Sequence, residues 1–159
     1  MEGADATAAS WSADEWVLLS DAPWIVAVGV MSSDPSGPIS TGRELDATLV
    51  MLRDGVDDPA GGPLVRAVCA ALVDRPLPDL RVDPGATHRS LRHCEQVVSL
   101  LSTRPGSAGP AFRRWLHRLG HAVADAAVDR GFLGLRGPRV SEAEQLHLDD
   151  LADALGLVD

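Results

Sequence analysis

Three segments of this chain carry the pattern Ser/Thr-x-x-Glu, and this pattern constrains the fold more than any other feature of the sequence. The three segments are residues 12–15, 41–44 and 141–144. In such a capping box, the hydroxyl and the glutamate bind backbone N–H groups that a helix start leaves unpaired. Each box precedes a stretch with apolar residues at helical spacing. We therefore predict that helices begin at these three points.

Other segments also indicate helices. Pro63 suits the first turn of a helix, because a residue at that position needs no backbone N–H. Thr87 is predicted to cap a helix in which Leu91, Cys94, Val98 and Leu101 form an apolar stripe. Residues 111–129 show the most regular apolar arc. The stretch 74–85, with three prolines, is expected to be extended.

Residues 24–31 are ambiguous, because their β-branched side chains suit a buried strand as well as a helix. We predict a helix. Pro23 is expected to kink the preceding helix or to begin a new one, since proline lacks an N–H group. No segment alternates polar and apolar residues over the length of a strand. The sequence therefore predicts an all-α fold, a compact bundle of six to seven helices. Residues 1–11 are expected to be a disordered tail and residues 12–159 a single helical domain.

One phrase of the sequence occurs twice. A tryptophan, Trp16 or Trp115, is followed by an apolar run, a glycine-rich loop, a Gly-Pro pair and a leucine-rich helix that carries Glu44 or Glu144. This spacing indicates two helix–loop–helix halves related by a pseudo-twofold duplication, which would bury their apolar faces against each other. Convergent helix capping would produce the same pattern, and both interpretations stay open.

The first copy reads W-x2-L-x3-P-x2-V-A, then D-x2-G-P-I-S-x3-E-L. From residue 16 to about residue 72, and more loosely over residues 115–157, this resembles the TerB-like helical family that is linked to tellurite resistance and stress. The resemblance implies an all-helical protein that binds a divalent cation through acidic loop–helix segments.

Oxygen ligands for Ca²⁺ or Mg²⁺ are available in both halves, since such cations prefer carboxylates. The candidate residues are Asp34, Ser36, Glu44, Asp125, Asp129 and Glu144. An EF-hand loop is excluded, because its twelfth position would be Leu45. The alternative interpretation is that Asp34 begins a turn and Glu44 caps a helix.

A second candidate metal site lies on the helix predicted for residues 111–129. His117, His121 and Asp125 follow one another at spacings of four, which places two imidazoles and a carboxylate on one helix face, as a Zn²⁺ site requires. The neighbouring Arg118 would oppose a metal. These residues also lie opposite the apolar arc, which favours a solvated face.

Charge is distributed unevenly along the chain. The net charge is −9, yet residues 61–139 hold 12 arginines and 6 acidic residues. This middle region would either neutralise the acidic ends or offer a basic face to a phosphate or an acidic protein. The candidate residues for such an anion or partner site are Arg89, Arg92, Arg113, Arg114 and Arg118. A nucleic-acid partner is disfavoured, because the net charge is acidic. In addition, only six aromatic residues could stack on bases.

The sequence lacks the common short motifs of enzymes, and the two cysteines are expected to be buried free thiols. The longest uncharged run around the apolar centre, residues 22–33, is shorter than a bilayer span. We therefore expect a bacterial, cytoplasmic protein without a membrane or nucleic-acid partner. The favoured function is a non-enzymatic interaction module of a stress or assembly system, with a divalent cation and an acidic partner or a homodimer as candidates. The alternatives are a metal-dependent enzyme using the histidines and a structural subunit of a larger complex.

Overall fold

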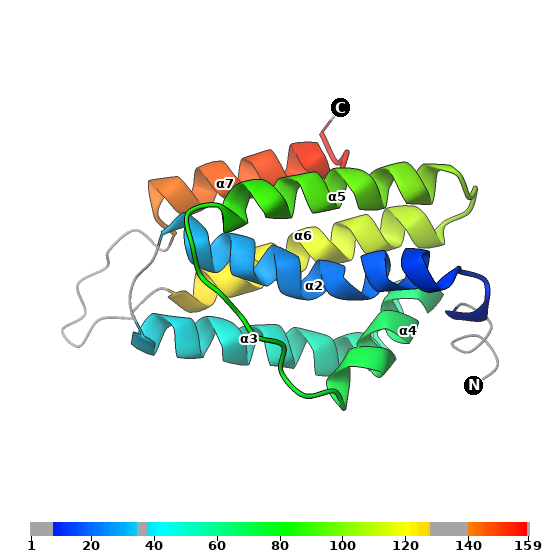
Figure 1. Cartoon of the computed structure of the whole chain (residues 1–159), viewed down its shortest axis with the longest axis horizontal. Helices are drawn as coiled ribbons and strands as arrows, with labels where there is room; N and C mark the ends of the chain where they lie inside the picture. Colours follow the sequence, from blue (N-terminus) through cyan, green and yellow to red (C-terminus); the bar gives the residue numbers. More distant parts are fainter. Residues whose placement is uncertain (1–7, 35–37, 128–139, 159) are drawn as a thin grey trace.

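The computed structural model describes residues 8–34, 38–127 and 140–158, and within these ranges it contains six α-helices and no strand. The prediction of an all-helical chain is therefore confirmed. The helices are α2 (Ala13–Ser33), α3 (Pro38–Asp57), α4 (Gly62–Val73), α5 (Ala86–Ser102), α6 (Ala108–Ala127) and α7 (Glu142–Ala154). Residues 74–85 cross the surface between α4 and α5 without helical structure, as expected (Figure 1).

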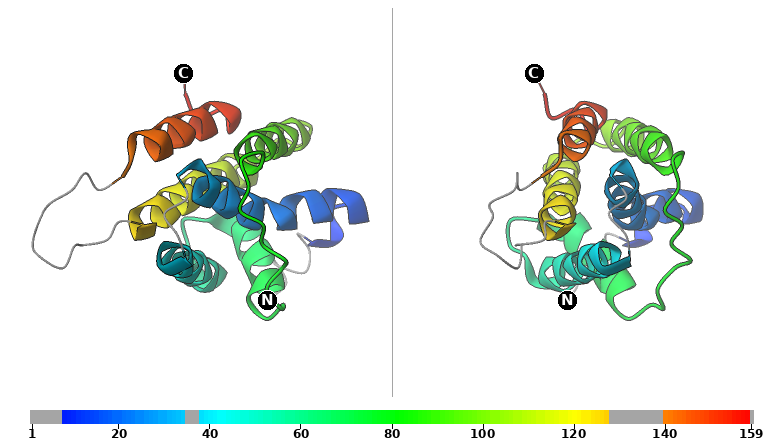
Figure 2. Two further views of the ribbon diagram at one scale, coloured as in Figure 1. Left: turned by 60° about the vertical axis from the view of Figure 1, so that its left-hand side comes forward. Right: turned by 90° about the vertical axis from the view of Figure 1, so that its left-hand side faces the viewer.

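Helix α2 is the central element of the bundle and contacts every other helix named above (Figures 1 and 2). Its residues 22–32 are apolar or small on all sides, which suits a helix that is covered all round. The helix predicted for residues 24–31 is confirmed as part of α2. Pro23 does not begin a new helix, because α2 continues through it.

The 21 residues of α2 also have the length and hydropathy of a membrane-spanning helix. In this fold, 56% of its most apolar stretch is buried inside the protein. A central helix of a water-soluble bundle and a membrane span meet the same criterion of length and composition.

Two of the three predicted capping boxes are present. The backbone N–H of Glu15 donates to Ser12 Oγ at 3.2 Å, and the N–H of Ser12 donates to Glu15 Oε2 at 2.8 Å. Ser141 and Glu144 form the same pair of hydrogen bonds at 3.1 Å and 2.9 Å. These bonds fix the starts of α2 and α7.

Two predicted helix starts are wrong. Helix α3 begins at Pro38, so Thr41 and Glu44 lie inside it; the fixed φ angle of proline suits a first helical residue. Helix α5 begins at Ala86 with Gly85 as its N-cap, and Thr87 donates its hydroxyl to the Pro84 carbonyl instead.

One apolar core draws side chains from all six helices. Its largest members are Trp115 and Phe112, which stack with ring centroids 6.2 Å apart. On α7, Leu148 is fully buried in this core, whereas Leu146 is 59% exposed. The two cysteines, Cys69 and Cys94, are buried free thiols, as predicted.

Candidate functional site

Buried polar side chains gather at one end of the bundle. There, the C-terminal ends of α2 and α6 meet the N-terminal ends of α3, α5 and α7 (Figure 1, left; Figure 2, right, looks onto this end). Five polar side chains are buried in these helix ends: Ser32, Glu44, Ser90, Glu144 and His147. We call these five residues the polar end. Polar groups are costly to bury without partners, so this concentration needs a physical explanation.

Three buried atoms of the polar end have no hydrogen-bond partner among the residues that the structure describes. They are Ser32 Oγ, Ser90 Oγ and His147 Nε2. The last two lie against Gly29 of α2: a Cβ atom on this glycine would be 2.6 Å from Ser90 Oγ and 3.1 Å from His147 Nε2. The absence of a side chain at Gly29 therefore lets α5 and α7 bring polar groups close to the backbone of α2.

Negative charge also accumulates here. The pKa of the Glu144 carboxyl is raised, chiefly because burial disfavours its charged form, and further because Asp34 and Asp125 lie nearby. The hydrogen bonds from Ser141 oppose this shift. Among the described residues, the charged groups that act on Glu144 are thus acidic. These carboxylates belong to three elements, since Asp34 ends α2, Asp125 lies on α6 and Glu144 lies on α7.

Of the six predicted cation ligands, Asp34 and Asp125 lie near enough to Glu144 to act on it electrostatically. Glu44 lies buried in the same end of the bundle, where its carbonyl accepts a hydrogen bond from the Thr48 hydroxyl at 2.9 Å. Ser36 and Asp129 lie outside the described residues. Among the residues that are described, no three His, Cys, Asp or Glu side chains are already arranged to hold a metal ion.

Two residues of the predicted histidine site are in contact. The rings of His117 and His121 meet edge to face, with centroids 4.6 Å apart. Burial and the neighbouring His121 lower the pKa of His117, whereas the Leu148 backbone and Asp149 act in the opposite direction. Because those last two residues belong to α7, His117 lies half-buried beside that helix. Asp125 is exposed one turn further along α6.

The five arginines predicted to bind an anion or a partner fall on two helices. On α6, Arg113 donates to the Leu155 carbonyl at 3.2 Å and Arg118 donates to Asp58 at 3.2 Å, while Arg114 is exposed. On α5, Arg89 and Arg92 line a groove against α2. Two of the three arginines on α6 therefore already have partners within the chain.

Sequence reasoning missed Ser32, Ser90, His147 and the groove beside α5. A signal was present for two of them. Ser90 lies four residues before Cys94 on the buried stripe of α5, and His147 lies between Glu144 and Leu151 on the buried stripe of α7. A polar residue at a stripe position indicates a buried polar group.

A comparison of this chain with known protein families, characterised proteins and solved structures finds no match.

Proposed function

We propose that this chain is a non-enzymatic helical interaction module in which a divalent cation, Ca²⁺ or Mg²⁺, binds at the polar end. The observation that carries this proposal is the burial of Glu144 at the end of the bundle where Asp34 of the α2 end and Asp125 of α6 lie near enough to act on it. The resemblance of the sequence to the TerB-like family supports the same class of ligand.

The chemistry of these residues suits a hard cation. Ca²⁺ takes about six to eight oxygen ligands and Mg²⁺ takes six, and waters and backbone carbonyls supply those that carboxylates do not. Since the three carboxylates come from three helices, a bound cation would remove their mutual repulsion and hold the ends of α2, α6 and α7 together. The surface formed by these ends is then the part that a partner would recognise.

Thermal unfolding tests the cation. A ligand that binds only the folded state stabilises it, by about 2.7 kcal/mol at a concentration 100 times its dissociation constant. For a chain of this size we expect millimolar Ca²⁺ or Mg²⁺ to raise the melting temperature by about 5 °C or more. Asp125→Asn should remove most of this shift. Asp54→Asn, an exposed site on α3, is the matched control and should retain it.

Two results would contradict the proposal. One is an unchanged melting temperature at millimolar concentrations of both cations. The other is an equal shift in Asp125→Asn and in the control, because the cation would then bind elsewhere.

A metal-dependent enzyme is the second candidate, and the ring contact between His117 and His121 favours it. Two imidazoles suit Zn²⁺ better than Ca²⁺. In this case the purified protein would contain stoichiometric Zn²⁺ or iron that is lost in His121→Ala and kept in Asp34→Asn. The cation proposal predicts the opposite dependence on these two variants.

A further inference from the structure

A groove separate from the carboxylates runs between α2, residues 78–81 and the first half of α5. Its volume is about 630 Å³, which is within the range of about 300–1,000 Å³ that is usual for small-molecule sites. Part of its lining is apolar: Trp24, Ile25 and Val28 of α2 face Leu80 of the crossing segment. All four side chains are only partly buried. An apolar ligand body would cover them and remove their remaining surface from water.

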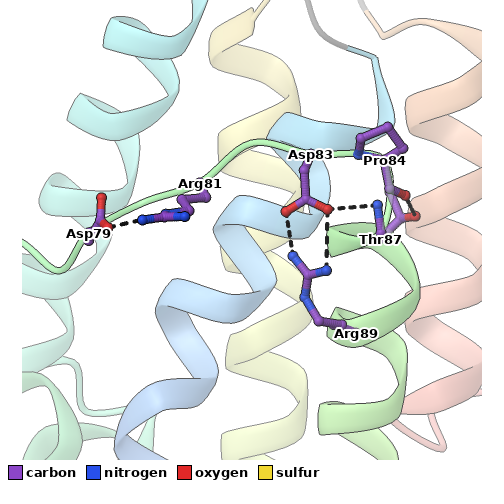
Figure 3. A network of polar contacts seen from close by, with 7 residues as sticks. Asp79, Arg81, Asp83, Pro84, Thr87 and Arg89 are labelled. Atoms are coloured by element: carbon purple, nitrogen blue, oxygen red, sulfur yellow. Dashed lines mark hydrogen bonds and ion pairs between the residues drawn. The ribbon is translucent and has the colours of Figure 1, made fainter.

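The crossing segment that closes the groove is held in place by ion pairs. Asp83 binds Arg89 through two hydrogen bonds of 2.5 Å and 3.2 Å, and Asp79 binds Arg81 at 3.2 Å (Figure 3). The same pairing lowers the pKa of Asp83, through its hydrogen bond with Arg89 first of all. The Asp83–Arg89 pair joins this segment to α5, and the exposed Asp79–Arg81 pair lies within the segment.

The opposite side is also fixed. His93 Nε2 lies 2.8 Å from the Leu18 carbonyl oxygen, and because a carbonyl only accepts, the ring nitrogen is the donor. This bond ties α5 to α2 beneath the rim. The groove therefore needs little rearrangement to receive a ligand, which lowers the cost of binding.

Within the described parts of the chain, one arginine on the rim of the groove has no partner. Arg92 is exposed, lines the groove, and makes no hydrogen bond or ion pair within the described parts of the chain. Arg81 and Arg89 also line the groove, and each guanidinium keeps N–H donors beyond those given to Asp79 and Asp83. His88 adds a further polar group on the same side. Hydrogen-bond donors that could bind an anion therefore lie beside the apolar side chains that line the groove.

We propose that this groove binds a small amphiphilic anion, with its apolar body on Trp24, Ile25 and Val28 and its anionic head on Arg92. A guanidinium holds a carboxylate, sulfonate or phosphate through paired, charge-assisted hydrogen bonds. The site is independent of the cation proposed above, because none of its lining residues belongs to the carboxylates at the polar end.

The charge on the other wall gives the proposal a second, opposite prediction. Asp21 of α2 lines the groove and, like Arg92, has no partner among the residues described. Its carboxylate repels an anion that occupies the groove. Removal of this charge should therefore strengthen binding, whereas removal of the Arg92 charge should weaken it.

The test uses two fluorescent probes of the same shape. 1-Anilinonaphthalene-8-sulfonate carries an anionic head, and N-phenyl-1-naphthylamine has the same aromatic body without a charge. We expect one molecule of the sulfonate to bind per chain. In Arg92→Gln its dissociation constant should rise about tenfold, the scale of one lost hydrogen bond to a charged group. In Asp21→Asn it should fall about threefold, the scale of an exposed ion pair.

Matched controls separate the groove from general apolar binding. The neutral probe should bind both variants as it binds the original protein. Arg114→Gln, which removes an exposed arginine of α6 outside the groove, should leave sulfonate binding unchanged. Equal sulfonate affinity in Arg92→Gln, Arg114→Gln and the original protein would overturn the proposal, as would binding of several probe molecules per chain. If Arg92→Gln does not fold, unchanged or weaker sulfonate binding in Asp21→Asn would overturn it.

Discussion

Replacement of Gly29 by alanine is expected to destabilise this protein, although alanine is the better helix former. Gly29 lies in the interior of α2, where it faces α5 and α7. An added Cβ atom would be 2.5 Å from Ser90 Cβ, 2.6 Å from Ser90 Oγ and 3.1 Å from His147 Nε2. Separations near 2.5 Å are far below van der Waals contact, so α2 and α5 would have to move apart.

The magnitude follows from two opposing effects. Overpacking of a core site typically costs about 1–3 kcal/mol. Replacement of a glycine by alanine inside a helix raises the free energy of unfolding by about 1 kcal/mol, because alanine has the higher helix propensity. We therefore expect the free energy of unfolding to fall by up to about 2 kcal/mol, with a melting temperature lower by up to roughly 8 °C for a chain of this length.

Urea unfolding, followed by circular dichroism, measures this change. Gly42→Ala is the matched control, because Gly42 also lies within a helix but its added Cβ would meet no described atom of another element within 4 Å. That variant should gain up to about 1 kcal/mol. The double variant Gly29→Ala, Ser90→Gly removes the side chain that clashes. Its loss should therefore be smaller than the sum of the two single losses.

A Gly29→Ala protein as stable as Gly42→Ala would refute the reasoning. So would strictly additive losses in the double variant, since the close contact between α2 and α5 would then not be the cause.

Three further predictions concern the polar end and the core. Burial lowers the pKa of His147 from its ordinary value of 6.5, so the unfolded chain takes up this proton first and stability falls as the pH drops below 6.5; His147→Gln should show a shallower decline in urea midpoints over this range. Loss of the N-cap in Ser141→Ala should cost about 1 kcal/mol, and an unchanged urea midpoint would contradict it. Burial raises the pKa of Cys69 and Cys94 to about 12, so iodoacetamide should leave both thiols unmodified at neutral pH in the folded protein and alkylate both in urea.

Local sequence patterns predicted the helix starts only where local contacts decide them. The boxes at Ser12 and Ser141 form as expected, because each joins atoms that are three residues apart. The box at Thr41 lies inside α3 instead, since Pro38 provides an earlier start. Likewise, Gly85 and not Thr87 is the N-cap of α5, and the Gly85 backbone N–H donates a hydrogen bond to Asp83 at 2.8 Å.

The candidate site was likewise predictable from the sequence only in part. Asp34, Asp125 and Glu144 were recognisable as carboxylates near helix ends, but their proximity depends on how α2, α6 and α7 pack. His117 was expected in solvent because its own helix places it opposite the apolar arc. Helix α7 approaches that face as well, and no pattern within α6 indicates this.

The sequence by itself determined that this chain is helical and where several of its helices begin, because caps and apolar spacing act over three to four residues of one segment. Only the tertiary structure decided which polar groups are enclosed and which face one another. Whether Ser90 and His147 lose contact with water depends on helices far away in the chain, and their approach to α2 requires that Gly29 carries no side chain.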